Sequence, residues 1–192
     1  GQLAEGVAFA HAHGVRVHVT VNIIAHNQHL AGLRDYLLYL QQIKVDALIM
    51  ADAGMIALAR EVVPQMEIHL STQASATNYA TFNFWHQQGV QRVVAARELS
   101  LEEIKEIRSH TPKTLQIEAF AHGAMCISIS GRCLLSHYLT GRDSNLGACT
   151  HPCRWQYRLV EESRPGEYFP IAEGEEGTYI FNSKDLCMVE YL

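Results

Sequence analysis

The stretch DALIMAD (residues 46–52) is a short apolar run closed by an acidic residue, which is typical of a buried β-strand. The sequence before it, HLAGLRDYLLYLQQI (residues 29–43), has strong helical periodicity. The sequence after it, GMIALAREVV (residues 54–63), predicts a second helix that ends at Pro64. We therefore expect a helix–strand–helix unit in this part of the chain.

The same alternation extends along most of the chain. Four further strands are predicted in VRVHVTVNII (residues 15–24), MEIHLSTQAS (residues 66–75), VQRVVAA (residues 90–96) and LQIEAFAHG (residues 115–123). Helices are predicted over residues 1–14, over residues 78–89, and from Ser100 to near His110, where Ser100 and Glu103 have the spacing of a capping box. Apolar strands separated by helices indicate an α/β fold with a parallel sheet.

Polar residues recur where the predicted strands end. They are Asn22, His26, Asp52, Gln73, Arg97, Glu98, Glu118 and His122. In a (β/α) TIM-like barrel such ends form a common rim, which is where this fold places its chemistry, so we favour a barrel over an open sheet. Five strands do not close an eight-stranded barrel, and we therefore expect an incomplete barrel that belongs to a longer protein.

The chain is expected to fall into three segments. Residues 1–125 would form the partial barrel, residues 126–159 a set of cysteine-rich loops, and residues 160–192 a small β excursion with the start of a further barrel helix. Within the excursion we expect a hairpin over YFPIAEGEEGTYIF (residues 168–181) and a helix that begins near Ser183.

Four of the five cysteines lie close together in the sequence, at Cys126, Cys133, Cys149 and Cys153. Three interpretations remain open: an iron–sulfur cluster held by four thiolates, a structural zinc site, or thiols that pack as small hydrophobic groups. Only Cys149 and Cys153 have the spacing of a zinc knuckle. For Cys187 we expect burial, although it is an alternative fourth ligand.

The charge of the chain is unevenly distributed around these cysteines. The net charge is −5, yet residues 126–159 contain four arginines and one acid, whereas residues 160–192 contain eight acids and two bases. Arg132 and Arg154 each adjoin a cysteine. The arginines form a patch that attracts an anionic substrate or a phosphate backbone, or they pair with the acidic segment that follows.

Other functional classes have little support in the sequence. There is no Gly-x-Ser-x-Gly elbow and no His-Glu-x-x-His motif, so no recognisable hydrolytic centre is present. No apolar run is long enough to span a bilayer, and no signal-peptide pattern opens the chain. We therefore expect a cytoplasmic protein without a membrane partner, whose clustered thiols stay reduced.

A longer motif carries a family resemblance. The sequence EAFAHGAMCISISGRCLLS (residues 118–136) closely resembles the signature of peptidase family U32, whose members include collagenase-like proteins. The segments VNIIAHN, DALIMAD, HLSTQAS and RELSLEEI resemble barrel segments of that family. Within it, GACTHPCRW (residues 147–155), RPGEY and GTYIFNSKDL are similar to the members that take part in prephenate-dependent hydroxylation of tRNA.

This resemblance implies a function and a set of site residues. It implies oxygen-independent hydroxylation of the wobble uridine of tRNA to 5-hydroxyuridine, with prephenate as co-substrate and a 4Fe-4S cluster on Cys126, Cys133, Cys149 and Cys153. We expect catalytic roles for Glu118, His122 and Arg132, and substrate contacts from Asn22, His26, Gln73 and Arg154. The alternatives are a collagenase-like peptidase, a hydroxylase component of ubiquinone biosynthesis, and a non-catalytic protein that acts with a second subunit or redox partner.

Overall fold

The computed structural model describes residues 1–130, 132–170 and 185–187. The chain divides into two compact units, Gly1–Ala119 and Phe120–Leu192, which we call the N-terminal unit and the C-terminal unit. In the part of the chain that is described, no helix is both long and apolar enough to cross a membrane.

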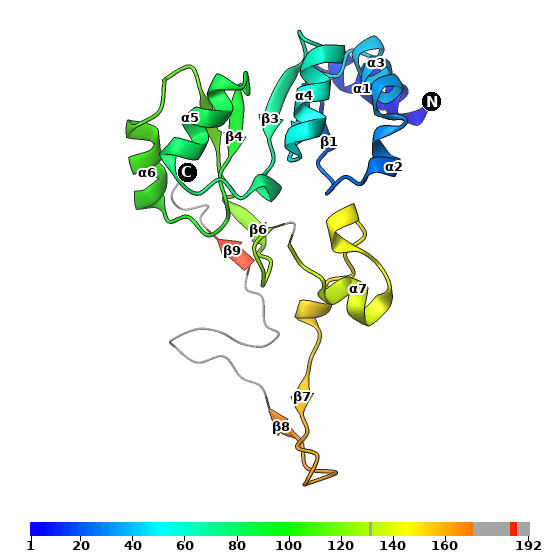
Figure 1. Ribbon diagram of the computed structural model, residues 1–192, viewed down its shortest axis with the longest axis vertical. Helices are drawn as coiled ribbons and strands as arrows, with labels where there is room; N and C mark the ends of the chain where they lie inside the picture. The colour runs from blue at the N-terminus through cyan, green and yellow to red at the C-terminus, as the bar shows by residue number, and fades with distance from the viewer. Residues whose placement is uncertain (131, 171–184, 188–192) are drawn as a thin grey trace. The chain divides into compact units, whose positions relative to one another are not determined.

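Helices alternate with parallel strands throughout the N-terminal unit (Figure 1). The strands are β1 (His18–Val21), β2 (Ala47–Met50), β3 (Glu67–Leu70), β4 (Arg92–Val94) and β5 (Gln116–Glu118). The helices are α1 (Gln2–Ala12), α2 (Asn27–Leu30), α3 (Leu33–Gln42), α4 (Ala53–Val62), α5 (Tyr79–Gln87) and α6 (Leu101–Ser109). The strand order is β1-β2-β3-β4-β5, and every neighbouring pair is parallel. The expected α/β fold with a five-stranded parallel sheet is thus confirmed.

Several helix ends follow from local side-chain chemistry. The Asp52 carboxylate accepts a hydrogen bond from the backbone N–H of Met55 at 2.9 Å and caps α4. The expected capping box of α6 is present, with Ser100 and Glu103 each bonding the other's backbone N–H. The single helix expected over residues 29–43 is instead broken into α2 and α3, with Gly32 as the N-cap of α3, in keeping with the poor helix propensity of glycine.

One face of the five-stranded sheet is apolar and is buried under the helices. Strand residues on this face include Val21, Leu48, Met50, Ile68, Leu70 and Val93. They belong to one core cluster with helix residues that include Leu33, Leu37, Leu40, Ile56, Phe82 and Ile107. Burial of this face is the main stabilising contribution that the fold offers.

The opposite face of the same sheet carries most of the polar strand residues, together with Ala47, Ile49 and Val94. Successive side chains on a strand point to opposite faces, so the pairing of His18 with Ala47 and Glu67, and of His69 with Arg92 and Gln116, puts these side chains together. The alternation in HVTV and EIHL therefore places Val19, Val21, Ile68 and Leu70 on the apolar face, and His18, Thr20, Glu67 and His69 on the opposite face.

The C-terminal unit contains short elements. The strands are β6 (His122–Ala124), β7 (Arg158–Leu159), β8 (Phe169–Pro170) and β9 (Asp185–Cys187). The helices are α7 (Leu135–Thr140) and three-residue 3-10 turns at Ser144–Leu146 and Pro152–Arg154. Strands β6 and β9 pair antiparallel, and so do β7 and β8.

Two expectations for this region are wrong. The strand expected over residues 115–123 is divided: β5 ends at Glu118, and His122 lies in β6, which belongs to a different sheet. The helix expected from Ser183 is replaced at Asp185–Cys187 by β9, because these residues pair with His122–Ala124 and tertiary pairing overrides a weak local preference. Most of the hairpin expected over residues 168–181 lies outside the described residues.

Two adjacent leucines of α3 test the assignment of the core. Leu37 is fully buried, whereas Leu38 is 44% exposed. Leu37→Ala should lower the free energy of unfolding by about 2–4 kcal/mol because it removes packed methyl groups and leaves a cavity. Leu38→Ala, the matched control, should cost less than about 1 kcal/mol in the same urea titration. Equal costs for the two variants would contradict the placement of α3.

Candidate functional site

The four clustered cysteines lie on two neighbouring segments of the C-terminal unit. Cys126 follows β6, and Cys133 lies just before α7. Cys149 lies three residues before the 3-10 turn Pro152–Arg154, and Cys153 lies within that turn. All four are free thiols; Cys126 and Cys149 are exposed, and Cys133 and Cys153 are half-buried. In the structure, therefore, no disulfide joins these four cysteines, and their side chains are at least partly accessible.

A network of hydroxyl groups holds the second cysteine segment against α7. Ser136, which is fully buried on α7, lies 3.0 Å from the Thr150 hydroxyl and accepts a hydrogen bond from the Thr150 backbone N–H at 3.0 Å. Thr140, one turn further along α7, lies 3.2 Å from the same Thr150 hydroxyl. Because Thr150 follows Cys149 directly, these bonds fix the cysteine segment next to the helix that Cys133 precedes.

Backbone geometry completes the two cysteine segments. Gly141 ends α7 with a φ of 69°, and Gly147 turns the chain with a φ of 79°, left-handed conformations that glycine adopts readily. His151 has a φ of 57°, and its N–H donates a hydrogen bond to Cys149 Sγ at 3.3 Å. The Tyr157 hydroxyl donates to the Pro152 carbonyl oxygen at 2.8 Å. A donated N–H bond stabilises negative charge on a sulfur atom.

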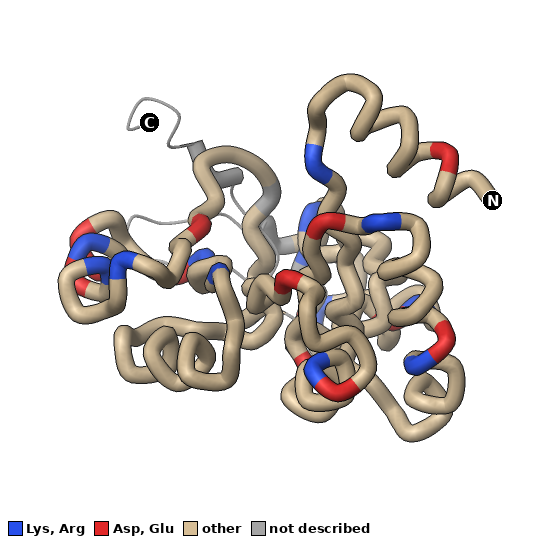
Figure 2. The backbone as a smooth tube through the Cα atoms, turned by 90° about the horizontal axis from the view of Figure 1, so that it is seen from above, with Lys and Arg blue, Asp and Glu red and all other residues tan. Residues whose placement is uncertain are grey.

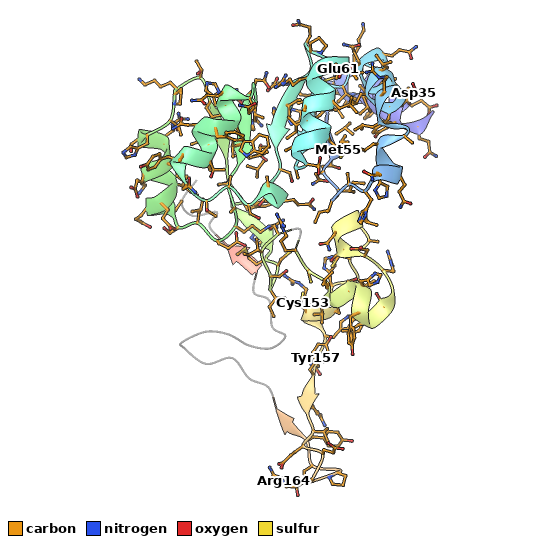
Figure 3. All side chains as sticks on the ribbon, in the orientation of Figure 1. Asp35, Met55, Glu61, Cys153, Tyr157 and Arg164 are labelled. Atoms are coloured by element: carbon orange, nitrogen blue, oxygen red, sulfur yellow. The ribbon has the colours of Figure 1, made fainter. Side chains whose placement is uncertain are left out.

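Cys153 is the thiol on which the other three clustered cysteines act. Burial raises the pKa of the Cys153 thiol, and the charges of Cys149, Cys126 and Cys133 raise this pKa further, while Arg154 lowers it. Figure 3 shows Cys153 and Tyr157 in succession on the segment that leads from α7 towards β7. Residues from both cysteine segments thus act on a single thiol.

A mononuclear metal site is not formed by the described residues. Among them, no group of three or more histidine, cysteine, aspartate or glutamate side chains is arranged to hold one metal ion. The donor set is nevertheless four sulfurs with nearby positive charge, which is the set that an iron–sulfur cluster takes.

Arginines surround the cysteine segments. Arg132 and Arg142 are exposed and make no ion pair within the described residues, while Arg158 lies over the Tyr168 ring at 5.7 Å. Figure 2 shows how the basic and acidic residues are distributed along the chain. The pairing of these arginines with the acidic residues 171–184 lies outside the described residues, whereas Arg164 pairs with Glu161 and Glu167.

The N-terminal unit holds two of the expected substrate residues after β1 and β3, the strands on either side of β2. Asn22 follows β1, and its Nδ2 donates to Ser71 Oγ at 3.1 Å. Gln73 follows β3 in the 3-10 turn Thr72–Ala74, and its backbone N–H donates to the same Ser71 Oγ at 3.2 Å. The Gln73 Oε1 atom is buried and has no hydrogen-bond partner among the described residues. Ser71 therefore joins the two residues into one polar site.

The other expected residues have separate environments. Glu118 ends β5, and its carboxylate accepts a hydrogen bond from Arg92 Nη1 at 3.0 Å in a salt bridge. His26 is exposed, and its backbone N–H donates to His29 Nδ1 at 2.9 Å at the start of α2. His122 and Arg154 are exposed in the C-terminal unit. Thus Asn22, His26, Gln73 and Glu118 belong to the N-terminal unit.

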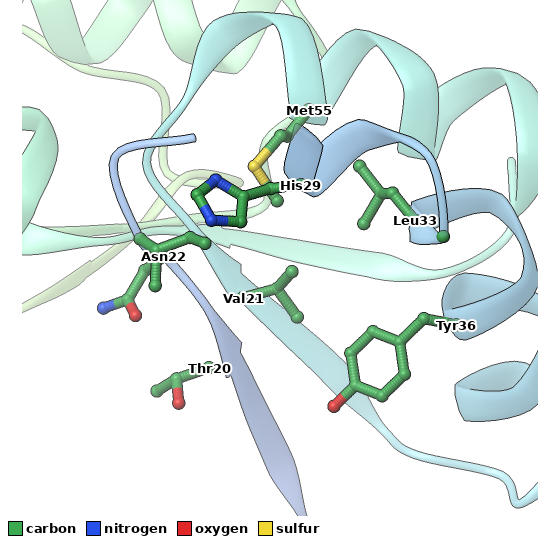
Figure 4. Close-up of a pocket in the computed structure, with 9 residues that line it drawn as sticks. Thr20, Val21, Asn22, His29, Leu33, Tyr36 and Met55 are labelled. Atoms are coloured by element: carbon green, nitrogen blue, oxygen red, sulfur yellow. The ribbon is translucent and has the colours of Figure 1, made fainter. Parts of the chain in front are cut away.

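A pocket of about 350 Å³ lies beside β1 (Figure 4). Its wall is mostly apolar, with Val21, Leu33 and Met55, and its polar groups include His29 and Tyr36. Burial raises the pKa of Tyr36, and Tyr39 raises it further. No lysine or arginine lines this pocket, so it offers no charge partner for a carboxylate or phosphate.

Sequence reasoning missed a histidine network on the polar face of the sheet. His69 is fully buried, its Nε2 lies 2.8 Å from Glu67 Oε1, and its ring meets the His18 ring edge-on at 4.7 Å. Glu67 in turn pairs with Arg16 at 2.6 Å. Two ring nitrogens, His18 Nε2 and His69 Nδ1, are buried and have no hydrogen-bond partner in the part of the chain that the structure describes. The alternation of EIHL and HVTV was the signal that could have placed these side chains on one face.

Comparison with known proteins gives a family and a set of relatives. The family model described as peptidase family U32 matches residues 1–192. The chain is 43% identical to tRNA hydroxylation protein P of Escherichia coli, covering 97% of this chain and 50% of that protein. It is also 43% identical to tRNA hydroxylation protein P1 of Bacillus subtilis, covering 98% and 44%. The chain therefore spans about half the length of these relatives.

Two further comparisons extend this result. The 23S rRNA 5-hydroxycytidine C2501 synthase of Escherichia coli is 39% identical, covering 83% of this chain and 24% of that protein. A solved structure of a U32 peptidase matches 64% of this chain and 52% of its own chain, with a TM-score of 0.55 and 19% sequence identity. At that identity the structural match supports the fold alone.

The buried histidine gives a pH prediction. Burial, the largest cause, holds the pKa of His69 below its ordinary value of 6.5, and Arg92 and His18 lower it while Glu67 raises it. The unfolded chain therefore takes up a proton before the folded chain does, so the free energy of unfolding should fall as the pH drops below 6.5. The pKa of Glu67 is lowered from 4.5, so the stability that its ionised carboxylate contributes should be lost only at more acidic pH.

Urea titrations between about pH 7.5 and pH 5 measure this effect. His69→Gln keeps a donor for Glu67 and removes the titration, so its stability should change less over this range than that of the parent protein. The exposed His137→Gln serves as the control and should keep the parental slope. An unchanged slope in His69→Gln would exclude His69 as the source.

Proposed function

The chain belongs to peptidase family U32, and on that basis we propose that the protein is an RNA-modifying enzyme that hydroxylates the wobble uridine of tRNA. The observation that carries this proposal is the coincidence of two features. Relatives named as tRNA hydroxylation proteins match nearly the whole chain, and Cys126, Cys133 and Cys149 all lie close enough to Cys153 to raise the pKa of its thiol. The product is 5-hydroxyuridine, and the proposed co-substrate is prephenate.

We propose that Cys126, Cys133, Cys149 and Cys153 hold a 4Fe-4S cluster. In such a cluster each cysteine binds a different iron atom, so its thiols need not meet at one point as they do around zinc. A shared neighbourhood without a mononuclear site fits the cluster better than zinc. When bound, the cluster supplies electron transfer.

The chain's own residues would support this centre in two ways. The Ser136–Thr150–Thr140 hydroxyl network would hold the two cysteine segments together, and the His151 N–H would stabilise charge on Cys149 Sγ. Arg132 and Arg154 are the proposed partners for carboxylates of the co-substrate or for phosphates of the RNA, because guanidinium groups bind both in bidentate fashion. His122 and Glu118 remain proposed catalytic residues.

The five-stranded sheet is proposed to be part of a (β/α) barrel. The polar strand ends with Asn22, Gln73 and Glu118 would then face the rim where barrel enzymes bind substrate. His26, beside the same strand end as Asn22, is retained as a proposed substrate contact. The protein is proposed to act in the cytoplasm, where the thiols stay reduced.

Two other functions can be separated from this one. A relative that acts on 23S rRNA favours cytidine hydroxylation in rRNA as the second candidate. A peptidase has less support, because within the described residues no histidine ring nitrogen bonds a cysteine thiol as a nucleophile–base pair requires.

Nucleoside analysis of RNA from a deletion strain tests the proposal. The wild-type gene should restore 5-hydroxyuridine in tRNA, whereas Cys126→Ala should reduce it at least about 100-fold, since one ligand of an electron-transfer centre is lost. Cys187→Ala is the matched control and should restore it fully.

The same samples decide between the candidates. Restored 5-hydroxycytidine in 23S rRNA with unchanged tRNA would favour the second candidate. Full rescue by Cys126→Ala would contradict a role for the cluster.

A further inference from the structure

The polar site at the ends of β1 and β3 consists of four uncharged side chains, Asn22, Ser71, Gln73 and Ser75. Ser71 is buried, and its hydroxyl oxygen accepts bonds from Asn22 Nδ2 at 3.1 Å and from the Gln73 N–H at 3.2 Å. The Asn22 amide is therefore held in one orientation, and its Oδ1 has no partner within the described residues.

Two of these side chains have buried polar atoms that nothing in the described chain satisfies. They are Gln73 Oε1 and Ser75 Oγ. A buried acceptor or hydroxyl without a partner is costly, and most such groups in proteins are bonded. A ligand that donates a hydrogen bond at this place would remove the cost.

The backbone that carries these groups is strained and rigidly anchored. Ser75 has a φ of 53° and a ψ of 47°, a left-handed conformation that a residue with a Cβ rarely adopts. The loop is tied to the end of β4, because the Thr72 hydroxyl donates to the Ala95 carbonyl oxygen at 3.4 Å and the Ala96 N–H donates to the Ala76 carbonyl oxygen at 3.1 Å. Strain that persists in an anchored loop is characteristic of ligand-binding sites.

We propose that this site reads the imide edge of the target uracil, with Gln73 Oε1 accepting a hydrogen bond from uracil N3–H. This inference rests on the proposed function, and it assigns the base specificity of that reaction to Gln73. A uracil edge presents a donor between two carbonyl acceptors, which neutral amide and hydroxyl groups complement. Cytosine has a bare nitrogen at the same position and would leave Gln73 Oε1 facing another acceptor. The charged co-substrate would bind elsewhere, because these four side chains carry no charge.

Two RNA probes isolate this single hydrogen bond. One is an anticodon stem–loop with uridine at the wobble position, and the other carries 3-methyluridine there, which lacks the N3–H donor. Binding to the purified protein is followed by fluorescence anisotropy. The wild-type protein should bind the uridine probe about fivefold more tightly than the methylated probe, the effect of one buried hydrogen bond. In Gln73→Leu this ratio should fall to about one.

A matched control and the proposed function are tested in the same experiment. Gln41→Leu, on the exposed side of α3, should keep the wild-type ratio. Thermal melting of both variants reports whether they remain folded. If Gln73→Leu does not fold, Gln73→Glu takes its place. This variant keeps the acceptor oxygen and should retain the preference for uridine. An undiminished ratio in folded Gln73→Leu, or loss of the preference in Gln73→Glu, would overturn the inference while leaving the proposed function intact. Failure of the wild-type protein to bind either probe would contradict both.

Discussion

The structure depends on the burial of one face of a five-stranded parallel sheet. Leu48, Ile68 and Leu70 are excluded from water beneath the helices, and their neighbours along each strand must then point the opposite way. Hydrophobic burial on one side therefore places Glu67 and His69 together on the other. Because side chains alternate along each strand, burial of the apolar face determines which side chains lie on the opposite face. Asn22 and Gln73 follow the ends of two of these strands, β1 and β3.

The C-terminal unit relies on a different kind of contact. Its described elements are short, and hydroxyl groups on α7 and on the loop hold the second cysteine segment, with Ser136 and Thr150 at the centre. Such bonds fix position without covering the thiols, so Cys126 and Cys149 stay exposed. This arrangement suits a centre whose ligands come from two loops and which exchanges electrons with a substrate or redox partner.

Sequence patterns predicted most of the N-terminal unit because its strands are apolar runs and its helices have identifiable caps. Ser100 and Glu103 formed the expected box. The patterns failed where pairing between distant residues determines the structure. Residues 119–121 were predicted to be part of a strand, yet the chain leaves the sheet after Glu118, and His122 pairs with β9. The four cysteines were singled out by their closeness in the sequence, and their proposed role as ligands came from the family resemblance. The Ser136–Thr150 contact joins residues fourteen positions apart and has no local signal.

The central claim is that four cysteines hold one iron–sulfur cluster. Its most direct test is the iron and acid-labile sulfide content of anaerobically purified protein, together with its visible absorption. We predict about four iron and four sulfide ions per chain with a broad band near 400 nm, loss of both in an alanine variant of Cys126, Cys133, Cys149 or Cys153, and retention in Cys187→Ala. Stoichiometric zinc in place of iron, or a full cluster in the Cys153→Ala variant, would contradict the account.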